Sequence, residues 1–260
     1  MTHRPQAAVL LAIAVLLTGC KPDKAVKTAA NIDNPAATSA APAVDPATAA
    51  TLHGTVSFSG TAPARIPIDM SMDPACALAP GTNLTEQILV AHGHLANVYV
   101  YIKSGAPTSS APASTAPVVL DQKGCRYLPH VIALQQGGTV EFHNSDPTMH
   151  NIHMTPTVGS DPAVDISQGP MGAAQTHTFT APAAMIPVRC NNHPWMSAFI
   201  NVAPNPWFAV TSADGTFTLP NLPPGTYTVA AVHEKLGEQD IQVTVPAKSN
   251  IQANFTFANK

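Results

Sequence analysis

The sequence predicts an all-β protein, and three observations carry that prediction. Segments 51–60, 95–103 and 137–144 alternate apolar with polar residues. They contain β-branched and aromatic residues, which are enriched in strands. Asp214-Gly215 separates two further alternating segments, and Asp-Gly at such a place is typical of a tight hairpin turn. We therefore expect short strands joined by turns over most of the chain.

Composition limits the kind of protein this can be. The chain has 260 residues, of which 45% are hydrophobic, enough for one or two domains with their own cores. Only 10% of the residues are charged, and the formal net charge is -3. No basic stripe is present, so nucleic acid is not an expected partner.

The first residues are typical of an export signal. Arg4 gives a positive start, and the apolar run 7–17 is too short to cross a membrane. The run ends in Leu-Thr-Gly-Cys20, which resembles the bacterial lipobox. That resemblance implies a signal peptide over 1–19, cleavage before Cys20, and acylation of Cys20. An ordinary signal peptide with an incidental cysteine is the alternative.

Residues 20–50 follow as an expected disordered tether. The segment is dominated by Ala, Pro, Thr and Asp and shows no apolar periodicity, so it cannot bury a core. Lys21 stands directly after the lipobox cysteine, and in Gram-negative bacteria that implies sorting to the outer membrane. We expect an exported lipoprotein that faces the periplasm and is held to the membrane by its N-terminal lipid.

One short stretch, 189–196, concentrates metal-binding side chains. It supplies Cys190, His193 and Met196 within seven residues, and His150 lies 40 positions upstream of Cys190. A thiolate, two imidazoles and a thioether are the ligands of a mononuclear blue-copper site, with Met as the weak axial ligand. A site with four protein ligands leaves no open position for a substrate, which argues against catalysis at the metal.

The spacing Cys-x2-His-x2-Met, with His150-Asn151 about forty residues earlier, resembles the cupredoxin family, and amicyanin-like blue-copper proteins in particular. The resemblance covers roughly 117–203. It implies a Greek-key β-sandwich or barrel that holds one copper ion at one end. Arg189 departs from the family, in which an aromatic residue often precedes the ligand cysteine.

The same resemblance assigns roles around the ligands. It implies that the outer edge of His193 reaches the surface as the electron port, and that Asn151 pins the ligand loop, so we expect a bond toward Asn191. Pro194 and Trp195 would form an apolar docking patch, although core packing is the alternative for Trp195.

Other histidines compete with the ligands. His153 is the main alternative to His150, but the side chains of an extended strand alternate between faces, so the two are expected to face apart. His153, His143 and His177 are expected to be solvated and uninvolved.

The flanks of the copper segment resemble one further family. Residues 214–227 resemble the carboxypeptidase regulatory-like, transthyretin-like β-sandwich, whose earlier strands match Gly54-Thr-Val56 and 96–100. We therefore expect one discontinuous sandwich of 51–105 and 206–260, with a cupredoxin domain of 106–205 inserted into it. Three consecutive all-β pieces are the alternative.

Two cysteines remain after Cys20 and Cys190 are assigned. Cys76 and Cys125 would form a disulfide in an oxidising compartment. A second metal site made of Cys125 and His130 is the alternative.

These observations favour a membrane-tethered periplasmic protein that passes single electrons between redox protein partners. No hydrolytic, phosphate-binding or acid–base constellation is found, so neither an enzyme nor a small-molecule substrate is expected. A copper-trafficking or copper-sensing lipoprotein is one alternative, suggested by the His- and Met-rich segment 149–154. A non-redox surface-binding β-domain is the other.

Overall fold

The computed structural model describes residues 44–79, 83–107, 112–155 and 161–259. The expected signal peptide, the lipidated Cys20 and most of the tether lie outside these residues. Within them, one helix, α1 (Pro74–Ala77), accompanies nineteen strands. The prediction of an all-β fold is thus confirmed. Among the described residues no helix is long and apolar enough to cross a membrane.

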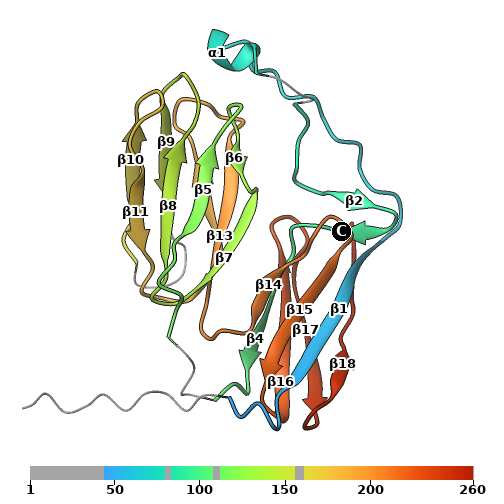
Figure 1. The fold of residues 1–260 in the computed structure, drawn as a ribbon. Coiled ribbons are helices and arrows are strands. Elements are labelled where there is room, and N and C mark those ends of the chain that lie inside the picture. Colours follow the sequence, from blue (N-terminus) through green and yellow to red (C-terminus); the bar gives the residue numbers. More distant parts are fainter. Residues whose placement is uncertain (1–43, 80–82, 108–111, 156–160, 260) are drawn as a thin grey trace, which may run out of the picture. The chain divides into compact units, whose positions relative to one another are not determined.

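Two sheets are built from both flanks of the chain (Figure 1). The first contains β15 (Thr216–Leu222), β1 (Ala50–Ser59), β3 (His94–Leu95), β2 (Val90–Ala91), β18 (Asn250–Gln252) and β19 (Phe255–Ala258). The second runs in the order β14 (Phe208–Val210), β4 (Tyr99–Ser104), β16 (Gly225–His233) and β17 (Gly237–Val245). One shared apolar core lies between them, with Leu52, Ile102 and Val229 fully buried.

Two other sheets come from the central part of the chain. The first runs in the order β10 (Val164–Gln168), β9 (His150–Met154), β12 (Ala183–Arg189), β13 (Ser197–Ala203) and β7 (Val131–Gln135). The second runs in the order β11 (Gln175–Thr178), β8 (Thr139–Asn144), β5 (Val118–Gln122) and β6 (Tyr127–Leu128). Their shared core includes Leu120, Phe142 and Ile200, all fully buried.

Two expected strands are shorter in the structure. The strand expected over 95–103 is broken, because Asn97 has a positive φ of 62° and the Val98 amide donates to Thr211 Oγ1 at 3.0 Å. The pairing therefore restarts at β4. The strand expected over 137–144 begins at Thr139 and ends at Asn144, so it does not carry His150. That histidine opens the next strand, β9, in the other sheet.

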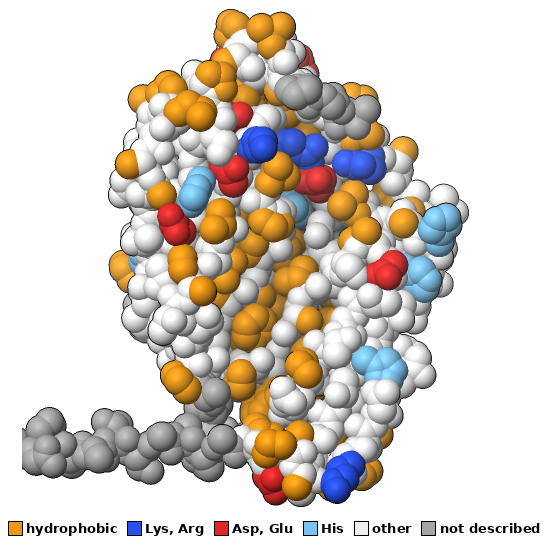
Figure 2. Space-filling model, in the orientation of Figure 1, with side chains coloured by type: hydrophobic (Ala, Val, Ile, Leu, Met, Phe, Trp, Pro, Cys, Tyr) orange, Lys and Arg blue, Asp and Glu red, His pale blue; other side chains and the backbone are white. Residues whose placement is uncertain are grey.

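A tyrosine near the start of β16 holds the loop between β15 and β16. The Tyr227 hydroxyl donates to Pro223 O at 2.6 Å, four residues upstream. Such a tyrosine corner ties a strand to its preceding loop in β-sandwiches. The face of the molecule in Figure 2 carries fewer charged than apolar side chains, in keeping with the low charged fraction of the sequence, and apolar side chains gather along its middle.

Candidate metal centre

A hairpin loop brings Cys190 and His193 together. β12 ends at Arg189 and pairs antiparallel with β13, where Arg189 lies opposite Ser197. The loop between them closes with a hydrogen bond from the Met196 amide to His193 O at 2.9 Å. The two strand ends lie side by side and the loop between them is short, so both side chains turn to the same side.

His150 reaches the same point from the neighbouring strand. β9 pairs with β12, with His153 opposite Arg189. The turn before β9 is held by Asn144, whose Nδ2 donates to Thr148 O at 2.9 Å and to Gly169 O at 2.8 Å. This turn explains why His150 opens β9 instead of extending β8.

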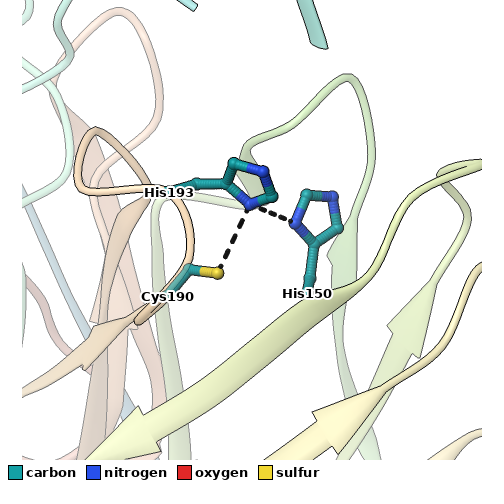
Figure 3. Close-up of side chains that lie close together, drawn as sticks. All are labelled: His150, Cys190 and His193. Atoms are coloured by element: carbon teal, nitrogen blue, oxygen red, sulfur yellow. Dashed lines mark hydrogen bonds between the residues drawn. The ribbon is translucent and has the colours of Figure 1, made fainter. Parts of the chain in front are cut away.

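The three side chains point toward one another (Figure 3). His150 Nδ1 lies 2.9 Å from His193 Nδ1, and Cys190 Sγ lies 3.5 Å from His193 Nδ1. All three are buried, with exposed fractions of 0% for His150 and 4% for Cys190 and for His193. One ligand atom from each lies within 4.8 Å of the others, so the cluster is compact enough to hold a metal ion.

Two carboxylates bind the far nitrogens of the imidazoles. His150 Nε2 lies 2.9 Å from Asp146 Oδ2, and His193 Nε2 lies 3.0 Å from Asp73 Oδ2. A carboxylate can only accept there, so each Nε2 keeps its proton and both Nδ1 atoms turn toward the centre. Carboxylates placed behind metal-binding histidines fix the ring tautomer in this way.

Sequence reasoning missed both carboxylates. Asp146 stands four residues before His150, and that spacing could have suggested it. It is anchored by amide hydrogen bonds from Gly124 at 2.6 Å and Cys125 at 2.8 Å. Asp73 lies 120 residues from His193, and no local pattern connects them.

The charges of the cluster are coupled. Burial opposes the charged form of His150, but hydrogen bonds to Asp146 and Cys190 outweigh burial and raise its pKa to about 9. Burial likewise opposes the Cys190 thiolate, yet hydrogen bonds from His150, the Asn192 amide and His193 lower its pKa to about 6. At neutral pH the metal-free cluster is therefore an imidazolium–thiolate pair.

Asn151 supports the ligand loop from behind. Its Oδ1 accepts a hydrogen bond from the Asn191 amide at 3.3 Å, the contact expected between these residues. Its Nδ2 donates to Asp165 and to Ile166 O, and its carbonyl accepts from Tyr127. Asn151 thus ties β9 both to the loop and to the opposite sheet.

Met196 and Trp195 lie on the core side of the loop. Met196 is 1% exposed and belongs to the same apolar core as Cys190. Trp195 is half-buried, and its Nε1 donates to Cys125 O at 3.1 Å, whereas Pro194 is exposed. Their role as a docking patch stays a prediction.

The expectation of an exposed His193 edge is wrong. The ring is buried, and its Nε2 faces Asp73 instead of solvent. Asp73 arrives on the segment between β1 and β2, which the resemblance to cupredoxins does not cover.

Within the described part of the chain, the competing histidines and the other two cysteines have partners of their own. Cys76 and Cys125 are disulfide-bonded, and His130 contacts Ser197 O and Glu234, so Cys125 and His130 do not form a metal site. The side chain of His153 is 41% exposed and pairs with Asp165. His143 pairs with Glu141, and His177 packs against Phe179.

Comparison with known protein families finds one match. The sequence profile of the carboxypeptidase regulatory-like domain matches residues 191–258. Comparison with curated proteins finds no match.

Among solved structures, two kinds of copper protein are similar in part. A methionine-to-alanine mutant of amicyanin in its Cu(I) form is 23% identical, with a TM-score of 0.31, over 40% of this chain and 97% of that one. A copper-containing nitrite reductase from Thermus scotoductus SA-01 is 24% identical, with a TM-score of 0.31, over 38% of this chain. The match spans a quarter (25%) of the reductase. At these scores the similarity says nothing about a metal in this chain, so the case for a metal rests on the donor atoms.

The donor atoms fit a copper ion. Two inward-facing imidazole nitrogens and a low-pKa sulfur surround one point. Imidazole and thiolate together suit copper in both oxidation states, and burial keeps competing water away. His150, Cys190 and His193 would hold the ion, and Met196 is the expected fourth ligand.

Proposed function

We propose that this protein carries single electrons on one copper ion held by His150, Cys190, His193 and Met196. The observation that carries the proposal is the inward orientation of both Nδ1 atoms toward a buried low-pKa thiol. Neutral inward-facing nitrogens only 2.9 Å apart repel each other unless a cation, either a proton or a metal ion, lies between them. The bound copper ion would supply the one-electron couple.

The protein's part in this function is to keep the donor atoms fixed. Asp146 and Asp73 hold the two rings, Asn151 holds the loop, and the paired strands β9, β12 and β13 hold the backbone. A site that moves little between oxidation states passes an electron without waiting for rearrangement. Four protein ligands would leave no place for a substrate, so we propose a carrier and not an enzyme.

The domain arrangement belongs to the same proposal. We propose that 106–205 forms a cupredoxin domain inserted into the sandwich of 51–105 and 206–260. β4, which precedes the insert, pairs antiparallel with β14, which follows it, and Tyr101 lies opposite Phe208. Neighbouring ends of this kind are what an insertion requires.

Export and lipidation complete the proposal. We propose that Cys20 carries the lipid that holds the protein at the outer membrane facing the periplasm, where redox proteins are its partners. Metabolic labelling with palmitate tests this, since Cys20→Ala should lose the label and release the protein from the membrane. Labelling that survives in Cys20→Ala would sink the lipoprotein hypothesis.

The deciding experiment uses a soluble form that begins after Cys20 and is loaded with Cu(II). We expect an intense visible charge-transfer band and narrow copper hyperfine splitting, both lost in Cys190→Ser. Met149→Leu is the matched control, because Met149 is 50% exposed and lies outside the cluster. A pale protein that still binds copper would favour trafficking, and a protein that binds none would leave a structural β-domain.

A further inference from the structure

A segment from the flanking part of the chain enters the core that surrounds the cluster. We call residues 68–79 the strap. Met70 and Cys76, which are 3% and 0% exposed, belong to the core of the central sheets, and Ile68 packs against it. The strap is thus packed as part of the metal-binding unit, although it lies between β1 and β2 in the sequence.

Asp73 uses each of its carboxylate oxygens for a different task. Oδ1 accepts the Ala75 amide at 2.8 Å and caps α1, which fixes the side-chain rotamer. Oδ2 accepts from Thr148 Oγ1 at 2.8 Å and from His193 Nε2 at 3.0 Å. The carboxylate therefore bridges the strap, the turn before His150 and the ligand loop.

A covalent bond holds the strap at this place. Cys76 is disulfide-bonded to Cys125. The residue before Cys125, Gly124, donates its amide to Asp146, the aspartate behind His150. Donor atoms of Asp73, Cys76 and His193 lie within 4.8 Å of one another, so the disulfide lies close to the His193 ring. The disulfide and the Asp73 hydrogen bonds thus hold the strap beside the same ring.

We propose that the strap is a disulfide-latched cover of the cluster and that Asp73 is the positioning residue by which it holds His193. The cover keeps the ring turned with Nδ1 inward and seals the edge through which metal or solvent would otherwise pass. This inference rests on the proposed function for its copper readout, and a second readout does not need copper.

The first test measures release of Cu(I) from the loaded soluble form to an excess of a Cu(I) chelator. Loss of a carboxylate behind a metal-binding histidine costs about 10–100-fold in metal affinity, so Asp73→Ala should release copper about that much faster. Asp73→Asn keeps an acceptor oxygen without the charge, so its rate of copper release should fall between those of wild type and Asp73→Ala. Asp69→Asn is the control, because Asp69 is in the strap but bonds only Ser71.

The second test measures alkylation of Cys190 by iodoacetamide in metal-free protein. Cys190 is the free cysteine among the described residues and is buried. Cys76→Ser/Cys125→Ser should raise the alkylation rate about tenfold or more, because removing the latch makes local opening easier. Thr148→Val should give a smaller increase, and Asp69→Asn none.

The outcomes separate the two ideas. If wild-type protein shows no copper–thiolate band, the proposed function fails. The alkylation rates alone then decide whether the strap covers the cluster. If the band is present but Asp73→Ala releases copper at the rate of Asp69→Asn, Asp73 is not a positioning residue. If the alkylation rate is also unchanged by Cys76→Ser/Cys125→Ser, the strap is not a cover.

Discussion

His150 and His193 face each other through their Nδ1 atoms at 2.9 Å, and the Nε2 of each ring is held by an aspartate. In the metal-free protein, below the His150 pKa of about 9, one proton lies between the two nitrogens. The raised pKa of His150 assigns that proton to His150. A metal ion that enters the cluster displaces it.

Metal affinity should therefore depend on pH. Between the Cys190 pKa of about 6 and the His150 pKa of about 9, binding releases one proton, so the association constant for Cu(II) should rise about tenfold per pH unit. Below this window two protons leave and the dependence steepens, and above it the constant levels off. Competition with a chelator of known proton affinity measures the association constant at each pH. A constant that stays level throughout the window would contradict the assignment.

Asp146→Asn should weaken metal binding. The asparagine no longer supplies a charged acceptor for His150 Nε2, and such losses cost about 10–100-fold in affinity. The comparison is best made above the pH window, where proton competition no longer contributes. Glu141→Gln is the control, since Glu141 pairs with a surface histidine. Equal affinities for the two variants would exclude a role for Asp146.

His233 should make the fold sensitive to acid. Burial lowers its pKa from 6.5 to about 4, so the unfolded chain takes up the proton first as the pH falls. The stability that the neutral ring contributes is complete above pH 6.5 and is lost between there and about pH 4, by roughly 2–3 kcal/mol. Urea unfolding of wild type and His233→Gln at pH 7 and 4.5 measures the difference.

His153→Gln is the control for that titration, because His153 is exposed. It should lose as much stability as wild type on acidification, whereas His233→Gln should lose less. Parallel losses in all three proteins would mean that His233 titrates normally in the folded state.

Gly54→Ala should destabilise the sandwich built from the two flanks. A Cβ at this position would lie 1.7 Å from the Ala253 carbonyl oxygen, so the backbone must shift. Overpacking of this kind costs about 1–3 kcal/mol or more. Gly169→Ala is the control, because a Cβ there meets nothing within 4 Å. Thermal unfolding that does not distinguish the two variants would contradict the close approach.

Much of the fold follows from local pattern. The strand expected over 51–60 is β1 (Ala50–Ser59), and the Asp-Gly turn appears where Gly215 has a positive φ of 72°. Alternation of apolar residues and turn chemistry are local properties, so a sequence displays them directly. The break at Asn97 was missed because it depends on Thr211, more than a hundred residues away.

The residues of the cluster likewise divide into those that a local pattern predicts and those that depend on distant contacts. Cys190, His193 and Met196 were found because one loop carries them, and His150 because a family spacing accompanies that loop. Asp146 lies only four residues before His150, but a lone aspartate before a proline can have many other roles. Asp73 could not be recognised from any nearby residue.

The sequence alone determined the all-β class and the residues that can bind a soft metal, because periodicity and donor chemistry are local properties of short segments. Only the tertiary structure decided which ring nitrogens face inward and that His193 is covered. Those properties depend on carboxylates and a disulfide that the folded chain brings from distant segments, through hydrogen bonds that only packing can align.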